Sequence, residues 1–369
     1  MLKKTIVLLP GDGIGPEVTR AAAGILRECA HEFGHQFDLP EFPLGGVAID
    51  VKGEPLPQET LDACQKADAV LLGAVGGPKW DSQPVGKRPE SGLLGIRKGL
   101  GLYINVRPVR LREPLRDISS LKRERLGELD LEIVRELAGG MYFGERGTEI
   151  LSGGERAFDT ESYSTAEIER IAAFAYTRAE IRSGRLTSVD KANVLVSSQL
   201  WRRTVAAMSQ LYPAVRVEHM YVDNAAMQLV LRPAQFDVIL TSNMFGDILS
   251  DEAAALVGSI GLLPSASFGT GTPLFEPIHG SAPQIAGKDA ANPIGAILSV
   301  VMMLRDTFGL GIEADWIERS LDRVLAAGYR TPDIAEPAGR MTGTSQFAEI
   351  LRQEMQLTLE HAERYGWGV

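Results

Sequence analysis

The residues best suited to chemistry are three aspartates with no histidine or cysteine cluster around them. Asp247 and Asp251 stand four residues apart in "SNMFGDILSDE", which places both carboxylates on one face at the start of a helix. Asp223 follows a strand-like run in "MYVDNAAMQ". Three carboxylates suit a hard divalent cation, Mg²⁺ or Mn²⁺, with positions left for water and substrate oxygens. The alternative is that the first two only cap the helix and complement its dipole.

Three arginines supply the opposite charge. Arg97, Arg107 and Arg135 occur in "GIRKGL", "NVRPV" and "VREL", and the last two lie in otherwise apolar strand contexts. An unpaired charge in such surroundings is costly, so each needs a partner. Arginine binds carboxylates through two parallel hydrogen bonds, so the partner is either an anionic substrate or a structural ion pair.

Two residues are candidates for proton transfer. Tyr142 follows Arg135 in "VRELAGGMYFG", and Lys191 follows a strand in "SVDKANVL". A lysine near a metal and arginines has its pKa lowered by like charge, which favours use as a general base. Each of the two residues alone is equally compatible with a surface or packing role.

The glycines of "LLPGDGIGPE", residues 8–17, resemble a dinucleotide-binding fingerprint without completing it. Gly11 and Gly13 fit the pattern G-x-G-x-x-G, but its third glycine is replaced by Pro16. Asp38, the nearest acidic residue at the usual distance, lies in "FDLPEFP", a poor strand. A Rossmann loop is therefore disfavoured. Pro16 suits the first turn of a helix, and the glycines allow the turn to pass close to a ligand.

Composition and charge exclude several classes of function. The 369 residues carry a net charge of −10, from 38 basic and 48 acidic residues. A nucleic acid or an anionic membrane as partner would need a concentrated basic patch, whereas a small anionic substrate needs only a local arginine cluster. Cys29 and Cys64 are far apart and typical of free thiols in a reducing compartment. The apolar runs are too short for a signal peptide or a membrane span, which predicts a cytoplasmic protein.

Strand-like runs alternate with helical patterns, as expected for an α/β protein whose buried strands read as continuous apolar runs. Strands are expected at 5–9, 67–74, 103–111, 131–137, 215–222 and 236–241, and helices at 17–33, 165–183, 198–211, 247–257, 293–308 and 316–327. Ser164 and Glu167 have the spacing of a capping box. Residues 141–164 break the pattern and predict a protruding hairpin around Ser152–Gly154, either a dimer arm or a solvated surface feature.

With these segments the sequence resembles the metal-dependent β-decarboxylating dehydrogenases of the isocitrate/isopropylmalate dehydrogenase family. The resemblance spans about residues 5–335 and rests on blocks in the expected order: "LPGDGIGPE", "GAVGGPKWD", "GLLGIRKGLGLYINVRP", "VRELAGGMYFGE", "SVDKANVL", "YVDNAAMQL", "NMFGDILSDEAA", "GLLPSAS" and "EPIHGSAPQIAGKDAANP". It implies a non-Rossmann fold of two α/β domains around a cleft. Residues 1–102 and 258–369 would form the NAD-binding domain, and residues 103–257 an inserted domain for dimerisation, metal and substrate. The protein would be a homodimer with shared active sites and 141–164 as its arm.

The resemblance also implies a role for each residue of the site. Arg97, Arg107 and Arg135 would bind substrate carboxylates, with Tyr142 beside them as proton donor. Asp247 and Asp251 would bind the metal, while Lys191, the base, and Asp223, a metal and substrate residue, would reach in from the neighbouring subunit. NAD would be bound by Glu276, His279, Gly280, Ser281, Ala282, Gln284, Ile285 and Asn292, with Ile14 and Gly15 bordering the nicotinamide.

The expected substrate follows from "PESGLLGIRK". Glu90, Leu93 and Leu94 precede Arg97 on one helical face, and paired leucines would form an apolar wall for an isopropyl group. Oxidative decarboxylation of 3-isopropylmalate, a step of leucine biosynthesis, is therefore expected. The alternatives are a sibling enzyme for D-malate, tartrate or homoisocitrate and a non-catalytic dimeric scaffold. NAD-using relatives generally carry an aspartate where this chain has Gln284, so NAD is expected with weaker discrimination against NADP.

Overall fold

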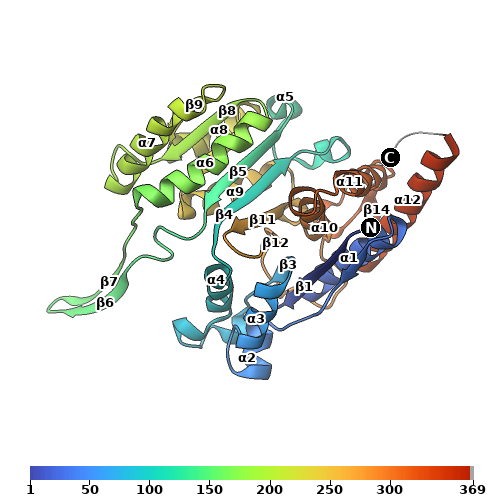
Figure 1. The fold of residues 1–369 in the computed structure, drawn as a ribbon, viewed down its shortest axis with the longest axis horizontal. Helices are drawn as coiled ribbons and strands as arrows, with labels where there is room; N and C mark the ends of the chain where they lie inside the picture. The colour runs from blue at the N-terminus through green and yellow to red at the C-terminus, as the bar shows by residue number, and fades with distance from the viewer. Residues whose placement is uncertain (366–369) are drawn as a thin grey trace. The chain divides into compact units, whose positions relative to one another are not determined.

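Residues 1–365 are described by a computed structural model, in which the chain forms two units (Figure 1). The first unit contains Met1–Leu102, Arg112–Ser119 and the chain from Val257 onward, and the second contains Tyr103–Leu111 and Ser120–Leu256. The boundaries expected from the sequence place residues 112–119 with the inserted domain, and here the structure differs. Arg112 forms ion pairs with Glu318 at 2.9 Å and Asp322 at 2.5 Å, which hold this segment to the first unit.

The first unit is built on a five-stranded part of the sheet whose centre is wholly buried. Its order is β2 (Gln36–Asp38), β1 (Lys3–Gly11), β3 (Ala69–Ala74), β12 (Leu274–Pro277) and β11 (Pro264–Gly269), parallel except between β11 and β12. Every residue of β3 is buried, which explains its continuous apolar sequence. A separate small sheet pairs β13 (Tyr329–Arg330) with β14 (Arg340–Met341).

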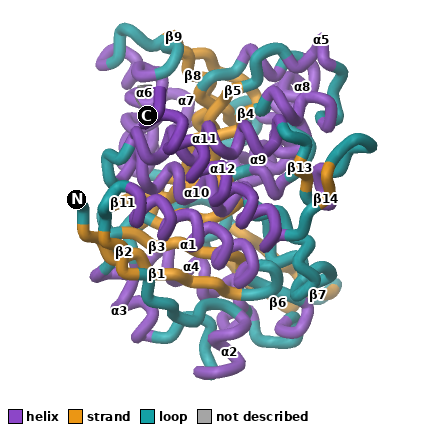
Figure 2. Tube along the Cα trace, turned by 90° about the vertical axis from the view of Figure 1, so that its right-hand side faces the viewer, coloured by secondary structure: helices purple, strands orange, loops and turns teal. Residues whose placement is uncertain are grey.

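Seven α-helices of the described residues belong to this unit. They are α1 (Gly15–Glu32), α2 (Gly46–Lys52), α3 (Gln58–Lys66), α4 (Pro89–Gly99), α10 (Ile294–Met302), α11 (Gly311–Ala326) and α12 (Thr344–Tyr365). Helix α10 continues as a π-helical turn, Met303–Thr307, and all nine of its own residues are buried. Helices α10, α11 and α12 lie beside one another (Figure 2).

The second unit has five strands of its own and a hairpin. The strand order is β4 (Leu102–Arg110), β5 (Asp130–Glu136), β10 (Val238–Thr241), β8 (Arg185–Asp190) and β9 (Arg216–Tyr221), parallel except between β4 and β5. Its helices are α5 (Arg123–Leu126), α6 (Thr165–Ile181), α7 (Val196–Met208), α8 (Val222–Leu231) and α9 (Asn243–Leu256). The antiparallel hairpin of β6 (Arg146–Leu151) and β7 (Gly154–Asp159) projects away from the rest of this unit (Figure 1).

Short 3-10 segments complete the chain. They span Pro78–Trp80, Val85–Lys87, Glu113–Ile118, Ser209–Leu211, Pro233–Gln235, Ile260–Leu262 and Pro332–Ile334.

The predicted α/β class, strands and helices are confirmed. The hairpin is present, and both hydrogen bonds of the capping box between Ser164 and Glu167 are formed. Helix α9, however, begins at Asn243, four residues earlier than expected. Asp247 therefore lies one turn inside the helix, where it cannot cap the helix start.

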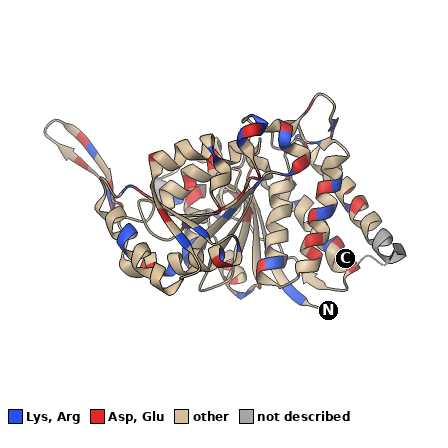
Figure 3. Cartoon of the chain, turned by 90° about the horizontal axis from the view of Figure 1, so that it is seen from above, with Lys and Arg blue, Asp and Glu red and all other residues tan. Residues whose placement is uncertain are grey.

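Charged residues of both signs are spread over the two units (Figure 3). None of the helices within residues 1–365 combines the length and apolarity needed to cross a membrane.

Candidate active site

In the second unit, β4, β5 and α9 bring two of the predicted arginines to one aspartate. Arg135 lies opposite Thr241 of β10, and α9 begins two residues beyond that strand. Gly246 lets α9 lie close to Arg135 of β5, because a Cβ on this glycine would lie 2.7 Å from Cγ of the arginine. The antiparallel strand β4 carries Arg107 on the other side of β5. These contacts place the two buried guanidinium groups beside Asp247, one turn inside α9.

Asp247 is the carboxylate shared by these groups. Nη1 of Arg135 donates a hydrogen bond to it, and Nη1 of Arg107 lies 3.3 Å from its Oδ1. The Tyr142 hydroxyl donates to Oδ2 at 3.0 Å. Arg135 is 2% exposed and Arg107 6%, so in these surroundings the charges interact strongly. Two cations and one phenol thus converge on a single carboxylate.

Tyr142 is held as a proton donor. Partial burial raises its pKa above the usual value, and the negative charge of Asp247 raises it further. The Arg135 guanidinium lies 5.7 Å from the centre of its ring, and Arg146 donates to its carbonyl oxygen at 2.5 Å. The phenol therefore keeps its proton at neutral pH and points it at the charged cluster.

Asp251 extends the cluster along α9. Its Oδ1 lies 3.8 Å from Nη1 of Arg107. Desolvation raises its pKa, and so does the negative charge of Asp247. Two carboxylates that repel each other on one helical face fit a divalent cation, which would relieve this repulsion. Within the described residues of one chain, however, no group of three or more His, Cys, Asp or Glu side chains is placed to hold a metal.

Lys191 and Asp223 are paired with each other and not with this cluster. Nζ of Lys191 lies 2.5 Å from Oδ1 of Asp223, between the end of β8 and the first turn of α8. The lysine hydrogen bond lowers the pKa of Asp223. The resemblance assigns these two residues to a neighbouring subunit's site, and in this chain they form an ion pair with each other.

In the first unit, α4 carries the predicted substrate wall. Glu90 in its first turn is exposed and lies against Gly76, while Leu93 and Leu94 are half-buried on the same face. Arg97 in its last turn is buried and pairs with Glu276 at 2.8 Å, and its Nε has no hydrogen-bond partner. The resemblance implies that Arg97 binds the substrate and Glu276 the cofactor; the structure joins them in one ion pair.

The opening glycines serve close contact between backbone segments. A Cβ on Gly11 would lie 2.0 Å from the Ala74 carbonyl oxygen, and one on Gly13 would lie 1.9 Å from that of Ser281. The buried Ile14 donates its N–H to the same Ser281 oxygen at 2.8 Å. Close approach to a ligand was expected here, and the structure instead places Ala74 and Ser281 of the protein against these glycines.

Asp12, between these glycines, was missed by the sequence reasoning. Its buried carboxylate accepts the N–H groups of Gly46, Val47 and Gly76 at 2.7–2.8 Å. One side chain thereby fixes the turn after β1, the start of α2 and the turn after β3. Its signal in the sequence was an acid enclosed by glycines directly after an apolar strand, where burial requires backbone donors.

The 279–285 segment has features that fit a nucleotide. His279 is buried, its Nδ1 lies 2.9 Å from the Gly280 carbonyl oxygen, and its Nε2 has no hydrogen-bond partner. Desolvation lowers its pKa, so the ring is neutral at pH 7 and offers one free nitrogen. Ala282 has a φ of 37°, a left-handed conformation rare outside glycine and typical of functional turns. Gly280 borders open space.

The remaining predicted cofactor residues are spread around this segment. Gln284 is exposed, Ile285 is half-buried, and Ser281 and Asn292 are buried. The Asn292 side chain donates to Asp333 at 3.0 Å and accepts the N–H of Ile294 at 3.0 Å. The Asn292 amide is used within the protein, so the buried His279 nitrogen beside the left-handed turn is the group that can accept a hydrogen bond from a nucleotide.

Comparison with known proteins gives the context for this geometry. The family model described as isocitrate/isopropylmalate dehydrogenase matches residues 5–351. The chain belongs to the isocitrate/isopropylmalate dehydrogenase family. The resemblance seen in the sequence is thereby confirmed, and so is the α/β fold that it implied.

Individual relatives cover almost the whole chain. A 3-isopropylmalate dehydrogenase from Moorella thermoacetica is 54% identical over 95% of this chain and 99% of its own length. One from Bacillus subtilis is 55% identical over 90% of this chain and 92% of its own length. Among solved structures, isocitrate dehydrogenase from Methylococcus capsulatus superposes with a TM-score of 0.85 at 33% identity, covering 96% of this chain and 99% of that one. A β-decarboxylating dehydrogenase from Thermococcus kodakarensis gives 0.79 at 36%, covering 98% of each.

Replacing Asp12 tests whether its carboxylate organises the opening loop. In Asp12→Asn the amide group faces one of the backbone N–H groups that the carboxylate accepts, leaving a buried donor unpaired. The free energy of unfolding should fall by roughly 1–3 kcal/mol, measured by urea denaturation. Asp50→Asn is the control, because Asp50 is an exposed acid of the neighbouring α2 paired with Lys79. Equal effects of the two substitutions would contradict this role.

Proposed function

We propose that this protein catalyses the oxidative decarboxylation of 3-isopropylmalate to 2-oxo-4-methylpentanoate with reduction of NAD⁺, the reaction used in leucine biosynthesis. The observation that carries the proposal is the convergence of Arg107, Arg135 and Tyr142 on Asp247. Its substrate assignment is supported by relatives of that name at 54–55% identity over at least 90% of the chain.

The arginines bind and orient the substrate. Arg97, Arg107 and Arg135 would each hold a carboxylate oxygen, because guanidinium groups buried among fixed partners are pre-organised for this. Glu90, Leu93 and Leu94 would contact the substituent on the carbon next to the departing carboxylate. The half-buried leucines favour an isopropyl group there over a third carboxylate.

Protons move through a lysine and a tyrosine. Lys191 would take the proton of the substrate hydroxyl as the carbon that bears this hydroxyl is oxidised. Loss of CO₂ leaves an electron pair on the neighbouring carbon, and Tyr142 would donate its proton there. The raised pKa of Tyr142 supports this order, because the phenol stays protonated until the carbanionic carbon forms.

A metal ion and a dinucleotide would supply the remaining chemistry. A divalent cation, Mg²⁺ or Mn²⁺, held by Asp247, Asp251 and Asp223, would act as a Lewis acid toward the substrate oxygens. NAD⁺, held by residues 279–285, Glu276 and Asn292 and bordered by Ile14 and Gly15, would accept the hydride. The exposed Gln284 in place of an acid supports NAD⁺ with only modest rejection of NADP⁺.

The functional form would be a homodimer. Met227, Val230 and Leu231 of α8 share one helical face and are 51%, 40% and 41% exposed, and Ile248 of the adjoining α9 is 57% exposed. A second copy covering this apolar face would explain it. In that dimer Lys191 and Asp223 would serve the partner's site, and the β6–β7 hairpin would act as an arm. The buried free thiols Cys29 and Cys64 support a reducing, cytoplasmic compartment.

Turnover of different acids tests the reaction. NADH formation is followed at 340 nm with NAD⁺ and Mg²⁺, comparing 3-isopropylmalate, D-malate and isocitrate. We expect kcat/KM to be at least tenfold higher for 3-isopropylmalate, in line with burying an added branched alkyl group, and activity to vanish with EDTA and return with Mg²⁺. Preference for D-malate would contradict the leucine wall, and activity unaffected by EDTA would contradict the metal site.

The dimer is tested by charging the apolar face. Sedimentation velocity should show the wild type as a dimer and Met227→Asp/Val230→Asp as a monomer, because buried unpaired charges disrupt an interface. Activity should fall with dissociation, since each site would lose its partner's Lys191. Leu211→Asp is the control, because Leu211 is 74% exposed on a different segment. A fully active monomeric wild type would contradict the shared site.

A further inference from the structure

Asn243 begins α9, the helix of Asp247, and hydrogen-bonds Arg135 of β5 and the loop that leads to Tyr142. Its side-chain oxygen accepts hydrogen bonds from Nε of Arg135 at 3.0 Å and Nη2 at 2.8 Å. Its side-chain nitrogen donates to the Gly139 carbonyl oxygen at 3.0 Å, in the loop that leads to Tyr142. Its backbone N–H, at the start of α9, donates to the Tyr163 hydroxyl at 2.9 Å. The residue is 1% exposed, so this geometry is fixed by packing.

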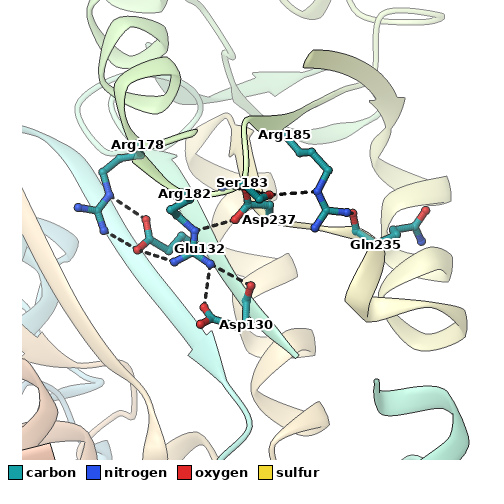
Figure 4. Close-up of polar contacts among 8 residues, drawn as sticks. All are labelled: Asp130, Glu132, Arg178, Arg182, Ser183, Arg185, Gln235 and Asp237. Atoms are coloured by element: carbon teal, nitrogen blue, oxygen red, sulfur yellow. Dashed lines mark hydrogen bonds and ion pairs between the residues drawn. The ribbon is translucent and has the colours of Figure 1, made fainter. Parts of the chain in front are cut away.

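A second group of arginines in the same unit, half-buried, is held differently. Arg178 and Arg182 bind carboxylates of Glu132, Asp130 and Asp237 at the opposite ends of β5 and β10 (Figure 4). Ser183 adds two hydrogen bonds to Asp237. In this network each guanidinium is surrounded by acids of the fold itself, which is the arrangement of a structural ion pair.

Nε and Nη2 of Arg135 donate hydrogen bonds to an amide oxygen, whereas Arg178 and Arg182 donate theirs to carboxylates. An amide oxygen satisfies two guanidinium N–H groups without adding negative charge. Asp247 and Asp251 already oppose Arg107 and Arg135, so a carboxylate at position 243 would give three acids against two cations. The neutral amide therefore fixes the direction of Arg135 and preserves its attraction for an anion.

We infer that Asn243 is a positioning residue for substrate binding, which orients the Arg135 guanidinium toward a substrate carboxylate while adding no negative charge beside it. The inference rests on the proposed function for the nature of the anion. Through Gly139 the same side chain sets the start of the loop that presents Tyr142. Asn243 was not among the residues singled out in the sequence.

The test compares Asn243→Asp and Asn243→Ala with the wild type. Aspartate keeps the shape and the hydrogen bonds to Arg135, adds a negative charge and loses the hydrogen bond to Gly139. Alanine removes the hydrogen bonds to both residues and leaves the charge of Arg135 unchanged. Steady-state assays give kcat and the two Michaelis constants, one for the acid substrate and one for NAD⁺. Binding of 3-isopropylmalate with Mg²⁺ is measured by calorimetry, and folding by the thermal midpoint.

Both variants should raise KM and Kd for 3-isopropylmalate about tenfold or more, the loss expected when a hydrogen bond to a charged group is removed or its charge is cancelled. KM for NAD⁺ should stay within about twofold of the wild type. Tyr163→Phe is the control, because it removes the hydroxyl at the start of α9 and leaves the amide on Arg135. It should lower the thermal midpoint with KM for the acid nearly unchanged.

A value of KM and Kd for Asn243→Asp within twofold of the wild type would overturn the inference. So would an equal rise of KM in Tyr163→Phe, which would assign the effect to the helix start. Failure of the proposed function is a separate result, seen when wild type does not turn over 3-isopropylmalate. The same variants are then measured on whichever of D-malate or isocitrate the wild type uses, since both acids carry carboxylates for Arg135.

Discussion

Burial of two guanidinium groups beside one another is the constraint on which the candidate site depends. Arg107 and Arg135 are almost inaccessible to water, and such cations are stable only with opposite charge and hydrogen bonds. Asp247 supplies the charge to both, and neutral groups supply the geometry: Asn243 for Arg135, and Asn105 at 2.7 Å and Ser250 at 2.6 Å for Arg107. The start of α9, the strand β5 and the Tyr142 loop are fixed by these contacts.

The same unit shows what arginines look like when they only stabilise the fold. Arg178 and Arg182 form ion pairs with three acids at the starts of β5 and β10, so their charge is compensated within the chain. Beside Asp247, the other acceptors of Arg107 and Arg135 are the neutral side chains of Asn105, Ser250 and Asn243. Because these acceptors carry no negative charge, the arrangement favours binding of an added anion. The two groups of arginines thus differ in the kind of partner, and Arg107 and Arg135 are also the more deeply buried.

Much of this could be predicted from the sequence, and the missing parts have physical reasons. Continuous apolar runs located the strands, and Arg107 and Arg135 were conspicuous because charges in such runs need partners. Glu136 gave the same signal and was overlooked, although its buried carboxylate orders the next loop through the N–H groups of Ala138 and Gly139. Asn243 could not be located by type or spacing, because its partners Arg135 and Gly139 lie 108 and 104 positions away along the chain. The pair of Arg97 with Glu276 spans 179 positions and was likewise invisible.

Helix α9 carries Asp247 and Asp251, the acids that would bind the cation, and metal binding there can be measured directly. Mn²⁺ is titrated by electron paramagnetic resonance, with 3-isopropylmalate present, for wild type, Asp251→Asn and Glu252→Gln. Glu252 is the next residue of the same helix and points elsewhere, so it controls for lost charge. We expect Asp251→Asn to weaken Mn²⁺ binding about tenfold or more, as for loss of one ligand, while Glu252→Gln binds like wild type. Equal Mn²⁺ affinity in Asp251→Asn and wild type would show that α9 does not hold the metal.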